Sequence, residues 1–228
     1  MDVREAGSSG RRVAHVTTVD SSLRYLLLNQ LERIRDEGHD VCGISADGPD
    51  VSTVEAHGIP HFAVPMTRRF TPVADLKALL ALIRVMRRER FDVVHTHTPK
   101  AGLLGQLAAR LSGVPIVVNT LHGFYFHEGT KPVQRRFYVW MERIAAKCSD
   151  TILSQNKEDI ATAVAEGIAD PDLVKWLGNG IDIERFDRRR VPDRDLDALR
   201  RSIELDPDAP VVGFVGRLVE DKGLLDLL

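Results

Sequence analysis

Short apolar runs alternate with longer segments of helical periodicity through most of this chain. Each run has the length and the content of Val, Ile and Leu that is typical of a buried strand. Seven strands are therefore predicted, over residues 12–18, 39–45, 61–64, 91–97, 115–120, 151–154 and 173–177.

The segments between these runs predict helices. Ser21 or Ser22 is expected to cap the first of them, which Gly38 ends. Thr71 followed by Pro72 is a strong start signal for another helix. The further predicted helices cover residues 51–56, 71–90, 103–111, 133–148, 157–166 and 196–203.

The predicted helix over residues 71–90 has an apolar face and a cationic face. The apolar face, expected to be buried, holds Leu76, Leu79, Leu80, Ile83 and Met86. The opposite face holds Lys77, Arg84, Arg87, Arg88 and Arg90, which follow Arg68 and Arg69. Cations on one side of a helix suit anionic lipid headgroups, so an anionic membrane surface is an expected partner. A solvated helix face is the alternative interpretation.

Strands that alternate with helices indicate the α/β class, with a Rossmann-like parallel sheet covered on both faces. Ligands of such sheets bind at the carboxyl ends of the strands. Here those ends carry Thr17 and Thr18, then His95 and His97, and then the segment 119–123. Candidate chemistry is therefore expected at this edge of the sheet.

The end of the chain resembles the opening of a second domain. An apolar run over residues 211–215 precedes Gly216, Arg217 and Lys222, a pattern typical of a buried strand and a phosphate-binding turn. The sequence predicts a disordered lead-in over residues 1–10, one domain over 11–187, a linker over 188–209 and the truncated start of a second Rossmann-like domain over 210–228.

Composition narrows the class of protein. The 228 residues include 31 Lys and Arg against 33 Asp and Glu, so no basic excess favours nucleic acid as a partner. Cys42 and Cys148 are far apart and form no CxxC pair, which favours a reducing, cytoplasmic compartment. The longest apolar runs are far shorter than the roughly 20 residues of a membrane span.

Several motifs occur in a fixed order. The segment 95–105 reads HTHTPKAGLLG, residues 120–124 read TLHGF, and residues 178–182 read GNGID. Together with Thr17, Thr18 and the segment 22–24, they resemble the signature of a bacterial subgroup of family 4 glycosyltransferases. That subgroup makes capsule, exopolysaccharide and O-antigen sugars, and the resemblance covers residues 12–228.

The resemblance implies a GT-B architecture, in which an N-terminal domain binds the acceptor and a C-terminal domain binds a nucleotide-diphosphate sugar. It implies retaining transfer to a lipid-linked or glycan acceptor, without a metal or other cofactor. The implied catalytic residue is His122, which faces the donor sugar. The implied donor diphosphate site is Gly216, Arg217 and Lys222. The acceptor-side residues expected are Thr18, Ser21, Arg24, His97, Lys100 and Gly123.

Two features depart from the family pattern. The turn after the first strand lacks the Gly-Gly pair of other family 4 members, which leaves the acceptor contacts open. The family's Glu-x7-Glu motif belongs to the later part of the donor domain, and the given sequence stops at Leu228, before that part. We therefore expect an incomplete, inactive fragment, with a non-enzymatic acceptor-binding remnant as the alternative.

Two other enzyme classes fit parts of this pattern. His95 and His97 point the same way on a strand and, with His122, suggest a metallohydrolase zinc site. The residues that follow include Lys100 and no acidic ligand, which disfavours a cation. A nicotinamide dehydrogenase is disfavoured because the first strand-helix turn lacks GxGxxG.

Overall fold

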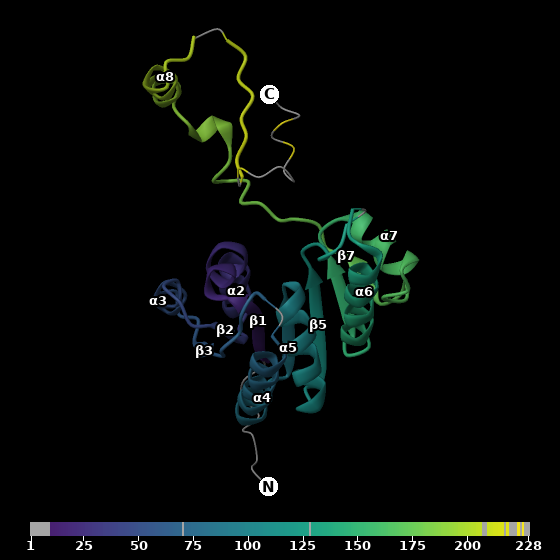
Figure 1. The fold of residues 1–228 in the computed structure, drawn as a ribbon. Helices are drawn as coiled ribbons and strands as arrows, with labels where there is room; N and C mark the ends of the chain where they lie inside the picture. Colours follow the sequence, from purple (N-terminus) through teal and green to yellow (C-terminus); the bar gives the residue numbers. More distant parts are fainter. Residues whose placement is uncertain are drawn as a thin grey trace. The chain divides into compact units, whose positions relative to one another are not determined.

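The computed structural model of the chain describes residues 10–69, 71–127, 129–206 and 209–216, together with 218, 223 and 225 (Figure 1). The chain divides into two compact units between Asn179 and Gly180. The predicted domain boundaries at 187 and 209 stay predictions. So does the disorder expected over residues 1–10, most of which lie outside the described residues.

The first unit is built on a single seven-stranded parallel sheet, which confirms the predicted α/β, Rossmann-like class. The strands follow the order β3-β2-β1-β4-β5-β6-β7. Their bounds are β1 Arg12–Val19, β2 Asp40–Ala46, β3 His61–Ala63, β4 Val93–His97, β5 Ile116–Leu121, β6 Thr151–Ser154 and β7 Val174–Trp176. The order reverses between β1 and β4, and a crevice at such a switch point is where open α/β sheets bind ligands.

Helices cover both faces of this sheet. They are α1 Asp20–Ser22, the π-helix η1 Leu23–Leu27, α2 Leu28–Asp36, α3 Val51–Ala56, α4 Pro72–Glu89, α5 Pro99–Leu111, α6 Pro132–Ala146 and α7 Lys157–Ala165. Contacts link α4 to α5 and α5 to α6, so these three lie side by side (Figure 1). Right-handed crossovers place α1, η1, α2 and α3 on the opposite face. No helix among the described residues combines the length and apolar character that crossing a membrane requires.

The helix after β1 does not begin as predicted. It starts at Asp20 with Val19 as its N-cap, and no side chain caps it, so the expected cap by Ser21 or Ser22 is wrong. Asp20 is buried instead, and its carboxylate accepts a hydrogen bond of 2.8 Å from the Asp50 amide. The turn is therefore held by the loop after β2, and the helix continues as the π-helix η1, which was not predicted.

The predicted apolar face of α4 is confirmed in part, because Met86 is buried and Leu79 and Ile83 pack partly buried against the core. Ala78, Leu82 and Met86 are buried in the core shared with α5, at a spacing of four residues. Leu76 and Leu80 were expected in the core and are instead 57% and 52% exposed. A row of side chains at every fourth residue covers the contact with α5. Leu76 and Leu80 lie beside this row and therefore remain exposed.

The second unit contains the 3-10 helix η2 Arg188–Arg190 and the helix α8 Asp193–Ser202. The helix α8 overlaps the one predicted over residues 196–203. The buried strand predicted over residues 211–215 is wrong, because these residues form no strand and Val212 is 78% exposed. A parallel strand needs a neighbour, and the described part of this unit contains no other strand.

Candidate functional site

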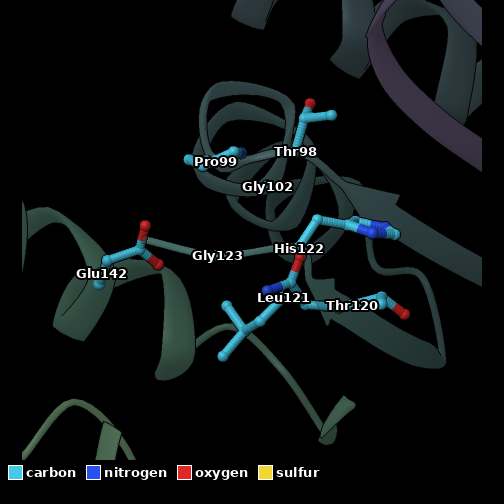
Figure 2. A pocket seen from close by; sticks show the side chains of 9 residues that line it. Thr98, Pro99, Gly102, Thr120, Leu121, His122, Gly123 and Glu142 are labelled. Atoms are coloured by element: carbon cyan, nitrogen blue, oxygen red, sulfur yellow. The ribbon is translucent and has the colours of Figure 1, made fainter. Parts of the chain in front are cut away.

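The predicted residues Thr18, His97, His122 and Gly123 come together at the carboxyl ends of β1, β4 and β5. Thr18 and Thr98 share a hydrogen bond of 2.9 Å between their hydroxyls, and His97 contacts His122. Gly123 has a φ of 104°, which glycine adopts without steric cost. This glycine lets the chain leave β5 sharply, directly after His122 (Figure 2).

Four histidines, which we call the histidine cluster, line this edge of the sheet. They are His15 on β1, His95 and His97 on β4, and His122 after β5. His15 Nδ1 lies 3.0 Å from His97 Nε2, and His97 Nδ1 lies 3.3 Å from His122 Nε2. The rings of His95 and His97 are tilted by 32° with their centroids 4.1 Å apart. His15 was not predicted, although a histidine inside the apolar run 12–18 was the available signal.

Gln155 sets the positions of the protons along this chain of rings. Its carbonyl oxygen, 3.0 Å from His122 Nδ1, can only accept, so Nδ1 carries the proton. His122 Nε2 then accepts from His97 Nδ1, and His97 Nε2 accepts from His15 Nδ1. This series of hydrogen bonds ends at His15 Nε2, which is buried and has no hydrogen-bond partner among the described residues.

Burial keeps the rings of this cluster neutral. His15, His95 and His97 are at most 7% exposed. Desolvation, reinforced by the neighbouring imidazoles, lowers the pKa of His95 to about 4 and holds those of His15 and His97 well below their usual value. The half-buried His122 has its pKa lowered by burial and, to a smaller extent, raised by its bond to Gln155.

The histidine trio with metal-ligand spacing is not the predicted one. His15, His95 and His97 have nitrogens within 4.8 Å of one another, so His15 takes the place expected for His122. A hydrolytic zinc keeps one coordination position open to substrate, whereas these three rings are buried inside the unit. The arrangement therefore does not favour a metallohydrolase.

Thr98 joins β4 to α5 in a strained conformation. Its φ of 66° and ψ of 141° lie in a region that β-branched residues rarely occupy. Its hydroxyl is held by Thr18, and α5 begins at the next residue, four residues earlier than predicted. Gly105 in the second turn of α5 packs so closely on β4 that an added Cβ would lie 2.7 Å from Thr96 Cγ2.

Lys100 lies in the first turn of α5 and is fully buried. Its ammonium pairs with the carboxylate of Asp75 on α4 and donates to Thr67 Oγ1 at 3.1 Å and to the Arg69 carbonyl. Lys100 therefore ties the segment before α4 to the start of α5. Its predicted contact with the acceptor stays a prediction.

The other two predicted acceptor-side residues lie on the helix after β1. Ser21 is half-buried within α1. Arg24 pairs with Asp50 at 2.6 Å and lies over the ring of Tyr25. The predicted donor residue Gly216 is exposed in the second unit, while Arg217 and Lys222 fall outside the described residues.

A small recess at this edge contains a residue that the sequence did not indicate. Its lining includes Thr98, Gly102, His122 and Gly123, and also Glu142 from α6 (Figure 2). Glu142 is 9% exposed, and burial raises the pKa of its carboxyl to about 7. The sequence showed only a charged residue within an amphipathic helix, and no motif marked it.

Comparison with known proteins identifies the family to which this chain belongs. The family model of the glycosyl transferase 4-like domain matches residues 23–180, which contain both partner strands of β1 and all of α5, β5 and α6. Two curated relatives have similar sequences. One, from Escherichia coli, is UDP-Gal:alpha-D-GlcNAc-diphosphoundecaprenol alpha-1,3-galactosyltransferase, 33% identical over 94% of this chain and 55% of its own length.

The second relative is the capsular polysaccharide biosynthesis glycosyltransferase CapM of Staphylococcus aureus, 30% identical over 96% of this chain and 56% of its own length. The chain thus spans about half the length of the curated relatives it matches. A solved glycosyltransferase from Rickettsia africae ESF-5 shares the fold, with a TM-score of 0.75 at 17% identity, over 95% of this chain and 55% of the other.

Proposed function

This chain belongs to the glycosyl transferase 4-like family, and from that membership we propose that it serves sugar transfer in cell-surface polysaccharide synthesis. The proposed donor is a nucleotide-diphosphate sugar, and the proposed acceptor is a lipid-linked or other glycan. The names of the E. coli and S. aureus relatives support this choice. We further propose that transfer retains anomeric configuration, needs no metal, and uses Gly216, Arg217 and Lys222 on the donor diphosphate.

The observation that carries the proposal is the position of His122. It is a neutral, half-buried imidazole at the carboxyl end of β5, followed by a glycine turn, beside the switch point of the sheet. A neutral imidazole can exchange hydrogen bonds with a sugar hydroxyl without bringing a permanent charge to the site. Thr18, Ser21, Arg24, His97, Lys100 and Gly123 remain the proposed acceptor-side residues.

Both ring nitrogens of His122 already have partners, His97 on one side and Gln155 on the other. A substrate hydroxyl that binds His122 has to replace one of them. His97 is 1% exposed and Gln155 is half-buried, so Gln155 is the exchangeable partner. We expect Gln155 to hold the His122 ring in place before the substrate arrives.

A transfer assay tests the proposal. The protein is expressed from its complete reading frame and supplied with UDP- and GDP-sugars and with polyprenyl-diphosphate glycans as acceptors. His122→Ala is expected to lower the rate by about 100-fold or more, while the surface change His57→Ala leaves it unchanged. Acceptor binding without any transfer would instead identify an acceptor-binding module, and equal rates for the two variants would remove His122 from the proposed site.

We also propose cytoplasmic location with peripheral attachment to an anionic membrane surface. The exposed side of α4 combines Leu76 and Leu80 with the cations Lys77, Arg84, Arg87 and Arg88. The exposed side of α6 adds Val133, Phe137 and Trp140 at the spacing of a helical face. Apolar and aromatic residues interleaved with cations suit a helix that lies in the headgroup region, where a lipid-linked acceptor would be reached.

A further inference from the structure

The histidine cluster contains a series of hydrogen bonds that is closed at its inner end. Gln155 Oε1 lies 3.0 Å from His122 Nδ1, and His122 Nε2 lies 3.3 Å from His97 Nδ1. His97 Nε2 in turn lies 3.0 Å from His15 Nδ1. His15 and His97 are 0% and 1% exposed, and His15 Nε2 has no hydrogen-bond partner among the described residues. Only the outer end, at the half-buried His122 and Gln155, can therefore reach a substrate.

These contacts link the tautomers of the three rings. A neutral imidazole carries one proton, so one of its nitrogens donates and the other accepts. Every ring carries its proton on Nδ1 or every ring carries it on Nε2, because any mixture places two N–H groups or two lone pairs against each other. Burial, which holds the pKa of His97 well below its usual value, keeps the series neutral and so preserves this rule.

The two arrangements differ at the ends of the series. With the protons on Nδ1, His122 presents an N–H toward Gln155, and His15 Nε2 is an unused lone pair. With the protons on Nε2, His122 presents a lone pair, and His15 keeps a buried N–H without an acceptor. Among backbone groups, a buried N–H without an acceptor is rarer than an acceptor with an unused lone pair, and the same preference favours the first arrangement here. The carbonyl oxygen of Gln155 favours it independently.

We propose that His97 and His15 are positioning residues that keep the proton of His122 on Nδ1 after a substrate has displaced Gln155. His122 then meets the substrate as a hydrogen-bond donor, and the group that it selects offers an oxygen lone pair, as a sugar hydroxyl or a carbonyl does. An ammonium group, which can only donate, is excluded. That the ligand is a sugar rests on the proposed function, whereas the place of the proton rests on the hydrogen-bonded series alone. His97 in this role acts through His122 and does not touch the substrate.

Imidazole ¹⁵N chemical shifts report which nitrogen of a neutral histidine carries the proton. The protein from the complete reading frame is labelled with ¹⁵N-histidine and measured at about pH 7.5, above the usual imidazole pKa of roughly 6.5. Loss of a signal in His122→Ala assigns His122. The decisive variant is Gln155→Met, which removes the acceptor at the outer end. We expect the His122 proton to lie on Nδ1 both in the wild type and in Gln155→Met.

A second substitution tests His97 itself. Adding His97→Leu to Gln155→Met leaves His122 without either partner, so signals of both tautomers are expected. The matched control is His95→Gln in the same background, because His95 is also buried but its Nε2 bonds Thr120, outside the series. This control should leave the His122 proton on Nδ1.

Two results would overturn the proposal. One is a His122 proton on Nε2, or a mixture of tautomers, in Gln155→Met. The other is an unchanged Nδ1 tautomer after His97→Leu is added. Gln155 is half-buried and outside the core, so the first result can be obtained even where the substitution of His97 prevents folding.

The two proposals can fail separately. An Nδ1 proton that survives in Gln155→Met, in a protein that transfers no sugar, would leave the positioning role standing and remove the proposed enzyme activity. Transfer that depends on His122, in a protein whose proton moves in Gln155→Met, would remove the positioning role alone.

Discussion

Acidification should destabilise the first unit through the histidine cluster, and His95 allows the size of the effect to be worked out. Its pKa is about 4 in the folded chain and near 6.5 when unfolded. Well above pH 6.5 neither the folded nor the unfolded state binds this proton, so His95 does not lower the free energy of unfolding there. Below that value only the unfolded state binds it, and the free energy of unfolding falls by about 1.4 kcal/mol per pH unit. The total loss from this one residue approaches about 3 kcal/mol near pH 4.

Urea unfolding followed by circular dichroism between about pH 4.5 and about pH 7.5 measures this dependence. His95→Gln should reduce the slope of unfolding free energy against pH by about 1.4 kcal/mol per pH unit. Thr96→Val is the matched control, because it removes the buried 2.8 Å hydrogen bond to Asn119 and lowers stability without removing a proton site. Curves for the wild type and His95→Gln that differ only by a constant offset would refute the reasoning.

Three further predictions concern the packing around the site and its exposed surface. Gly105→Ala should lower the free energy of unfolding by about 1–3 kcal/mol through the close contact with Thr96 Cγ2. Adding Thr96→Ser, which removes Cγ2, should restore part of that loss. An unchanged urea midpoint in Gly105→Ala would contradict this. Lys100→Met should cost about 3 kcal/mol or more because the Asp75 carboxylate loses its cationic partner and keeps only the Thr71 amide. Adding Asp75→Asn should recover stability, and additive losses would argue against the pair. Trp140→Ser should weaken binding to anionic vesicles by about 10-fold in co-sedimentation, with neutral vesicles as the control; equal binding would exclude α6 as the contact.

The sheet was predictable because its signal is local. A buried parallel strand needs only a short apolar run, and each of the seven runs predicted in the first unit overlaps a strand of the structure. The position of His122 and Gly123 followed for the same reason, since a strand end places the residues after it at the edge of the sheet.

The features that were missed depend on partners far away in the sequence. The serine cap was displaced because Asp20 is held by the Asp50 amide, thirty residues later. The burial of Lys100 was not predicted, because nothing near it in the sequence reveals its pairing with Asp75. The place of Glu142 in the recess was missed because helical periodicity alone does not settle which side of α6 faces the start of α5.

The position of β1 inside the sheet, between β2 and β4, has a consequence for biosynthesis. His15 pairs with His97, 82 residues later, and the β1 strand has β4 as one of its two neighbours. A ribosome at about 5–20 residues per second therefore leaves the first strand half-paired for several seconds until β4 emerges. His15, which ends up sealed against the β4 imidazoles, is exposed during that interval. The nascent N-terminal half is thus the stage at which this protein should depend most on chaperones, and loss of β4 pairing should show first as poor yield of folded chain.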